Sequence, residues 1–121
     1  MNLVVATRHT GPHMRFDVEG RWQNGDALKL AYMIKAAAAR LKLDSVIIDL
    51  RRVVTPPNAQ GKFLICDRLR RALTMNTRVG VVALPELVDC EAPTLEQCPD
   101  VARFDAEADA LHWLERQKVL H

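Results

Sequence analysis

The chain has 121 residues, a length typical of one domain that buries about two thirds of the surface its unfolded form exposes. Its 49% hydrophobic and 26% charged residues argue against a disordered chain and against a transmembrane protein, and its net charge of +2 argues against a nucleic-acid partner. We therefore expect a single domain over residues 1–121. The N-terminal residues lack the pattern of a signal peptide, so we expect a cytoplasmic location.

The first part of the chain predicts two strands, a helix and a third strand. Met14, Phe16 and Val18 alternate with charged residues, which is the period of a strand with one buried face. The turn before that strand is short and favours antiparallel pairing with the strand that precedes it. In chain order we predict a strand at Leu3–Thr7, a strand at Met14–Trp22, a helix from Asn24 or Asp26 to about Lys42, and a strand at Ser45–Leu50.

The second part of the chain alternates helices with strands. We predict a turn at Val54–Asn58, a helix at Ala59–Thr74, a strand at Arg78–Leu84, a loop at Pro85–Asp100, a strand at Val101–Phe104 and a last helix capped by Asp105. Strands that are separated by helices need crossover connections, which give parallel neighbours. The predicted fold class is therefore α/β: a mainly parallel mixed sheet of about five strands with one antiparallel edge strand, packed with about three to four helices.

Cysteine and histidine spacing gives no metal or disulfide signature. Cys66, Cys90 and Cys98 are odd in number and form no closely spaced pair, so we expect reduced thiols. His9 and His13 flank a turn, but two imidazoles make only half of a zinc site, and solvated histidines are the simpler interpretation. We predict neither a metal nor a cofactor.

The turn after the third strand is the candidate site. Backbone amides at the start of the next helix favour an anion, with Asn58 as a helix cap and Arg51 as a nearby charge. Asp49 is either a base whose pKa is raised by burial or a structural acceptor for amides of the turn. Arg68 belongs to a basic group that binds an acidic partner or a lipid phosphate, or is simply solvated. The predicted binding residues are Asp49, Arg51, Thr55, Asn58 and Arg68, and no catalytic residue is assigned.

Three stretches of the sequence resemble the STAS domain, and within it the small stand-alone bacterial branch. They are Val46-Ile47-Ile48-Asp49-Leu50 with the turn and helix that follow, Arg78-Val79-Gly80-Val81-Val82, and Phe104-Asp105 leading to Ala110-Leu111-His112-Trp113-Leu114. Proteins of that branch typically end in a phenylalanine strand and an Ala-x-x-Trp-Leu helix. The resemblance covers about residues 14–116 and implies an anti-sigma-factor-antagonist-like fold.

The chain departs from this family at its phosphorylation switch. In anti-sigma-factor antagonists the corresponding turn carries Asp-Ser-Ser-Gly, and a serine there is phosphorylated. Here Pro57 stands where the aspartate belongs and Asn58 stands near the serine. Thr55, the hydroxyl of this turn, comes three residues early, so the resemblance does not carry the switch to this chain.

Three functions follow as hypotheses. The first is a non-enzymatic, regulatory STAS-like module that binds a partner protein or a small apolar or anionic ligand at the turn. The second is a carrier for a lipid or another apolar molecule, held between helix and sheet under residues Pro85–Pro99. The third is an enzyme that uses Asp49. The sequence also leaves open a homodimer through the wet face of the sheet or the edge strand Leu3–Thr7.

Overall fold

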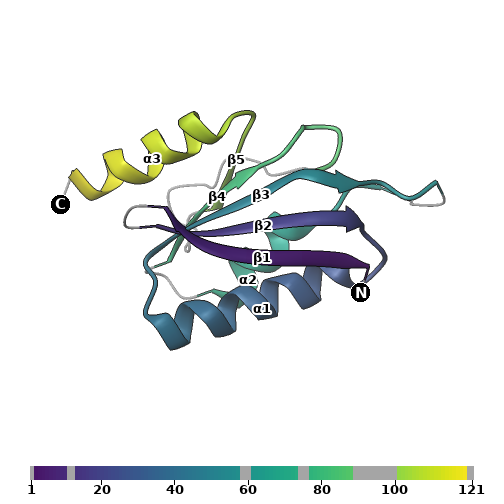
Figure 1. The fold of residues 1–121 in the computed structure, drawn as a ribbon, viewed down its shortest axis with the longest axis horizontal. Coiled ribbons are helices and arrows are strands. Elements are labelled where there is room, and N and C mark those ends of the chain that lie inside the picture. The colour runs from purple at the N-terminus through teal and green to yellow at the C-terminus, as the bar shows by residue number, and fades with distance from the viewer. Residues whose placement is uncertain (1, 11–12, 58–60, 74–76, 89–100, 120–121) are drawn as a thin grey trace.

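The computed structural model describes residues 2–10, 13–57, 61–73, 77–88 and 101–119. Five strands form one sheet in the spatial order of the chain: β1 (Leu3–Thr10), β2 (His13–Arg21), β3 (Ser45–Val54), β4 (Arg78–Val82) and β5 (Val101–Phe104). β1 is antiparallel to β2, and each of the other neighbouring pairs is parallel. Helices α1 (Asp26–Leu41) and α2 (Ile65–Ala72) cover one face, and α3 (Glu107–Val119) lies on the other (Figure 1).

This architecture confirms the predicted fold class, including the antiparallel edge strand. β3 runs to Val54 rather than Leu50, because its pairing with β2 continues as far as Arg21 and Val54. α2 begins at Ile65 rather than Ala59, and Gly61 before it has a φ of 87°, a left-handed conformation that a continuous helix does not allow. Most of the predicted loop Pro85–Asp100 lies outside the described residues.

The sheet separates two apolar clusters of unequal size. The larger cluster lies between the sheet and the helices α1 and α2, with Phe16, Leu30 and Ile48 near its centre. The smaller cluster lies under α3 and consists of the buried residues Ile47, Val82, Ala110 and Leu114. Successive strand residues point to opposite faces, which is why Ile47 and Ile48 belong to different clusters.

Two glycines make close backbone approaches in the sheet. Gly20 on β2 has a φ of 123°, and a Cβ there would lie 2.3 Å from the carbonyl oxygen of Asn2. Gly80 on β4 lies under α3, where an added Cβ would meet the Cβ of Ala110 at 3.2 Å. A side chain at position 80 would therefore need Ala110 to move by a few tenths of an ångström, so Gly80 favours the close approach of α3 to β4.

A bulge in β3 changes which face its side chains occupy. The pairing moves from Asp17 opposite Asp49 to Glu19 opposite Arg52, so β3 contains one residue more than β2 over this stretch. The side chains of Arg51 and Arg52, although consecutive, therefore both lie on the face of the sheet that carries α3, where they line one groove. The bulge thereby concentrates positive charge on that face.

Two sequence-based expectations are wrong. His13 is not solvated: it is buried at the start of β2, and its Nδ1 lies 2.7 Å from the hydroxyl of Ser45. Cys66, buried on α2, is disulfide-bonded rather than reduced. Structural disulfides are rare in the cytosol, so the cytoplasmic location stays a prediction. Within the described part of the chain, no helix is long and apolar enough to cross a bilayer.

Candidate functional site: a charged groove on the open face of the sheet

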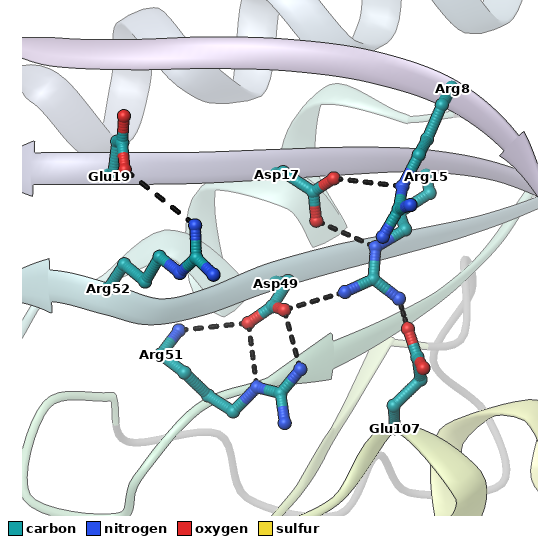
Figure 2. Close-up of polar contacts among 8 residues, drawn as sticks. All are labelled: Arg8, Arg15, Asp17, Glu19, Asp49, Arg51, Arg52 and Glu107. Carbon is teal, nitrogen blue, oxygen red and sulfur yellow. Dashed lines mark hydrogen bonds and ion pairs between the residues drawn. The ribbon is translucent and has the colours of Figure 1, made fainter.

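A groove of about 740 Å³ lies on the face of the sheet that carries α3. Its floor comes from β1, β2 and β3, and Glu107 at the start of α3 forms one side (Figure 2). We call it the charged groove, because most of its lining side chains are ionised. These are the arginines Arg8, Arg15, Arg51 and Arg52 and the carboxylates Asp17, Glu19, Asp49 and Glu107.

Arg15 on β2 joins three carboxylates at the centre of the groove. Its Nε lies 2.6 Å from Asp17 and its Nη2 lies 2.7 Å from Asp49 on the neighbouring strand. Its Nη1 pairs with Glu107 of α3. The Arg15 side chain is 6% exposed, so this guanidinium is nearly desolvated and all three of its nitrogens have acidic partners (Figure 2). Such a buried cation is tolerated only when it is paired in this way.

Asp49 on β3 receives hydrogen bonds at both carboxylate oxygens. Its Oδ1 accepts from the backbone N–H and the Nε of Arg51, each at 3.0 Å. Its Oδ2 accepts from Nη2 of Arg51 and from Nη2 of Arg15, each at 2.7 Å. The aspartate is therefore a saturated acceptor that holds the two arginines in place.

The pKa of Asp49 reflects this environment. Burial raises the pKa of the Asp49 carboxyl, but the hydrogen bonds from Arg51 and the positive charges of Arg51 and Arg15 outweigh burial, and the net pKa is lowered. The same pairing with Asp49 raises the pKa of Arg51. Of the two alternatives for Asp49, the lowered pKa favours the structural acceptor over a base with a raised pKa, and Asp49 is held as a carboxylate.

The rim of the groove is exposed and carries charges of both signs. Arg8 on β1 pairs with Asp17 at 3.1 Å, and its side chain is 62% exposed. Arg52 approaches Glu19 at only 4.0 Å, with exposures of 83% and 57%. Exposed pairs of this kind contribute little to stability, so these side chains are free to exchange partners. The centre of the groove is organised by buried contacts, whereas its rim is available for contacts with another molecule.

The structure divides the predicted binding residues among different places. Asp49 and Arg51 lie together in the charged groove. Thr55 is exposed just beyond the end of β3. Arg68 on α2 lines a separate cavity of about 190 Å³. Asn58 lies outside the described residues.

The wider basic group considered from the sequence does not gather into one patch. Nη2 of Arg70 donates to the carbonyl oxygen of Val101 at 2.8 Å. The guanidinium of Arg78 lies 4.5 Å from the ring centroid of Trp113, a cation–π contact. Arg70 and Arg78 therefore serve the packing around β5 and α3 rather than the groove.

Sequence reasoning missed Arg15, Asp17 and Glu107. Arg15 and Asp17 were noted only as the polar half of an alternating strand, which is the pattern of a solvated face. Their parallel neighbour Asp49 and the helix residue Glu107 come from distant parts of the chain. The usable signal was the combination of a charged strand face with an aspartate at the end of the apolar run of the next strand. Among the residues that the structure describes, no three His, Cys, Asp or Glu side chains gather to hold a metal ion.

The fold of the chain is similar to that of solved structures. The chain is similar to the crystal structure of an anti-sigma factor antagonist from Mycobacterium paratuberculosis, with a TM-score of 0.61 and 17% identity over 93% of this chain and 94% of that chain. It also matches an uncharacterised protein of the DUF3478 family with a SpoIIAA-like fold from Shewanella loihica PV-4, with a TM-score of 0.49 and 14% identity over 93% of each chain. No protein-family model and no curated protein matches the sequence.

The chain therefore has a STAS-like fold, as its sequence motifs implied. At 17% identity the likeness to the anti-sigma factor antagonist shows the fold alone.

Proposed function

We propose that this protein is a non-enzymatic, regulatory module that binds a partner protein through the charged groove. The observation that carries this proposal is the arrangement of the eight charged side chains: a fixed, buried centre around Arg15 and an exposed rim of both signs. Charge complementarity of this kind gives a protein interface its specificity and its association rate. The similar structure from Mycobacterium paratuberculosis is named for antagonising an anti-sigma factor, and action through protein contact is consistent with that name.

The partner that suits the groove presents charged side chains of both signs. The rim contributes the cations Arg8, Arg51 and Arg52 and the carboxylate Glu19, each at least 45% exposed. A partner surface with acidic side chains opposite β3 and a basic side chain opposite Glu19 complements this pattern. A second copy of the chain carries the same mixture of charges, so a homodimer is an outcome that the test distinguishes.

The same proposal includes the turn after β3. Thr55 is exposed at the end of the strand that supplies Asp49 and Arg51, and Asn58 follows it in sequence. A partner seated over the carboxyl end of β3 reaches both the groove and this turn. We therefore keep Thr55 and Asn58 as proposed contacts at the edge of the interface.

A charge-reversal pull-down tests this function. Wild-type protein and the Arg52→Glu variant are used as baits in an extract of the host, because Arg52 is 83% exposed and its replacement leaves the buried centre intact. The matched control is Arg71→Glu, which reverses an exposed arginine on α2, on the other side of the sheet. The proposal expects partners that wild type and Arg71→Glu retain and that Arg52→Glu loses.

Identical sets of partners for all three baits would remove the groove from the interface. An Asn58→Arg variant, compared in the same way, tests whether the interface extends to the turn. Light scattering of the purified baits decides whether the partner is a second copy, since a homodimer that Arg52→Glu dissociates assigns the groove to self-association.

Two other hypotheses gain no support from the described residues. The lipid carrier was expected to hold its ligand under residues Pro85–Pro99, most of which lie outside the described residues, and the 740 Å³ groove is not an apolar cavity, because charged side chains line most of it. Native mass spectrometry after mild extraction tests this hypothesis, because a clean apo mass argues against a tightly held lipid. An enzyme that uses Asp49 as a base needs a carboxyl with a raised pKa, and the pKa of Asp49 is lowered.

A further inference from the structure

A second cavity, of about 190 Å³, lies on the opposite face from the charged groove, where β2 ends and α1 begins. Its walls are largely apolar. Trp22 stacks on Phe63 with ring centroids 5.5 Å apart and an angle of 18° between the rings. Leu28 of α1 and Leu64, next to α2, complete the apolar lining, and both are exposed, at 41% and 50%. These features describe an open hollow with an aromatic base.

The ionised groups that line this cavity are cations. Lys62 and Arg68 line it, and no aspartate or glutamate of the described chain does so. In that part of the chain neither cation forms an ion pair with a carboxylate. Arg71, which lies on α2 with Arg68, does form one, with Asp67 at 3.4 Å. Two unpaired positive charges beside an apolar wall are suited to an anion that also has an apolar body.

Trp22 and Gly25, which precedes α1, also line the cavity. Trp22 is 4% exposed, and its indole Nε1 is buried without a hydrogen-bond partner among the described residues. A buried donor left unpaired costs free energy, but this N–H has almost no accessible surface and is therefore not counted as a contact for a ligand. The N-cap residue of α1 is Gly25, which has no side chain to cap the first amides of the helix. The carboxylate of Asp26 accepts from the amide of Gln23 and does not line the cavity.

We propose that this cavity binds a small monocarboxylate with an aromatic or short aliphatic body. The apolar body lies against Trp22, Phe63 and Leu64, and the carboxylate lies toward Lys62 and Arg68. A cavity of about 150 Å³ holds one benzene molecule, and 190 Å³ therefore leaves room for the carboxylate as well. The cavity is smaller than the roughly 300–1,000 Å³ of sites for larger ligands. This site is independent of the charged groove and of the partner proposed for it.

Benzoate is the probe for this proposal, and the indole N–H signals of the full chain in a nitrogen–proton correlation spectrum are the readout. The two tryptophans give two such signals, and Trp22→Phe assigns them. We expect benzoate to shift the Trp22 signal and leave that of Trp113 unchanged, with a Kd of about 1 mM or tighter. Benzyl alcohol has the same ring without the charge, and we expect it to bind at least about tenfold more weakly.

Matched variants separate the proposed contacts from general charge effects. Arg68→Gln and Lys62→Gln each remove one cation of the cavity, and we expect each to weaken benzoate about tenfold. Arg71→Gln removes the same charge from the same helix at a site outside the cavity, and we expect it to bind like wild type. Arg52→Glu, in the charged groove, is expected to bind benzoate unchanged, so the two sites fail or succeed separately.

Three results would each overturn the proposal: a Trp22 signal that benzoate does not move, equal binding of benzyl alcohol and benzoate, or equal weakening by Arg68→Gln and Arg71→Gln. The second result would describe an apolar hollow without charge recognition. The third would describe nonspecific attraction to a basic helix.

Discussion

Replacing Arg15 by methionine removes the cation at the centre of the charged groove while keeping a long apolar side chain. The substitution leaves the carboxylates of Asp17, Asp49 and Glu107 facing one another without their shared partner. Breaking a buried ion pair from one side costs about 3–5 kcal/mol, because the remaining charge stays buried. The loss of stability is smaller here, because the side chains of Asp17 and Glu107 are 34% and 35% exposed and water screens their charges.

The buried partner sets the size of the effect. The Asp49 side chain is 13% exposed, and it keeps its bonds to Arg51 in the variant. We therefore expect Arg15→Met to lower the free energy of unfolding by about 2–3 kcal/mol. For a domain of this size each kcal/mol corresponds to about 4 °C, so the melting temperature should fall by about 8–12 °C.

Urea unfolding at pH 7, followed by circular dichroism, measures this loss as a shift of the midpoint at constant slope. Arg8→Met is the matched control, since Arg8 also pairs with Asp17 but is 62% exposed. The control should cost at most about 1 kcal/mol. If Arg15→Met costs no more than Arg8→Met, the three-carboxylate contact does not organise the groove, and the reasoning from its burial is wrong.

Three further predictions concern single positions. The pKa of Asp49 is lowered from 3.8, so its contribution to stability is present above about pH 4 and is lost as the pH falls through the folded-state pKa. The free energy of unfolding of Asp49→Asn, measured with urea, should therefore be about 1–2 kcal/mol below that of wild type at pH 7, and the two values should converge toward pH 2. A constant difference between the two proteins over this pH range would contradict the prediction. Gly20 has a positive φ, and Gly20→Ala places a Cβ against the carbonyl oxygen of Asn2. We expect the variant to lose about 2 kcal/mol or more of its free energy of unfolding, seen as a lower melting temperature. An unchanged melting temperature would show that the N-terminal end of β1 moves aside without cost. Gly80→Val drives a side chain into Ala110, and we expect faster amide exchange in α3 and a loss of about 1–3 kcal/mol; unchanged α3 exchange would rule out close packing of this helix on β4.

Hydrophobic periodicity predicted the fold because the apolar residues of the strands and helices recur at regular spacings. The continuous apolar run at β3 and the spaced apolar residues of α1 and α3 follow the periods of two and 3.6 that burial imposes. Their order along the chain then fixed a parallel sheet, because helices between strands require crossovers. The predicted helix α2 was too long, because the spacing of apolar residues carries no information about the left-handed backbone at Gly61.

The groove was only half predictable. Asp49 and Arg51 were identified because they end a buried run next to a proline turn. Arg15 was not, because a charged residue in an alternating strand looks solvated until its distant partners are known. Its partner Glu107 belongs to α3, and sequence spacing carries no information about where that helix lies on the sheet.

The extra residue in β3 adds one cation to the groove without removing an apolar residue from the core. Leu50 and Val53 both reach the main core only because the strand counts three positions against two on β2. In a strand without the bulge, the same residues would alternate regularly, and Val53 would face outward while Arg52 faced the core. Deleting one of the two arginines would remove the bulge, keep Val53 in the core and take one cation from the groove, so a relative with a regular strand is expected to have one residue fewer here. An ungapped alignment to such a relative would assign every residue after Arg51 to the wrong side.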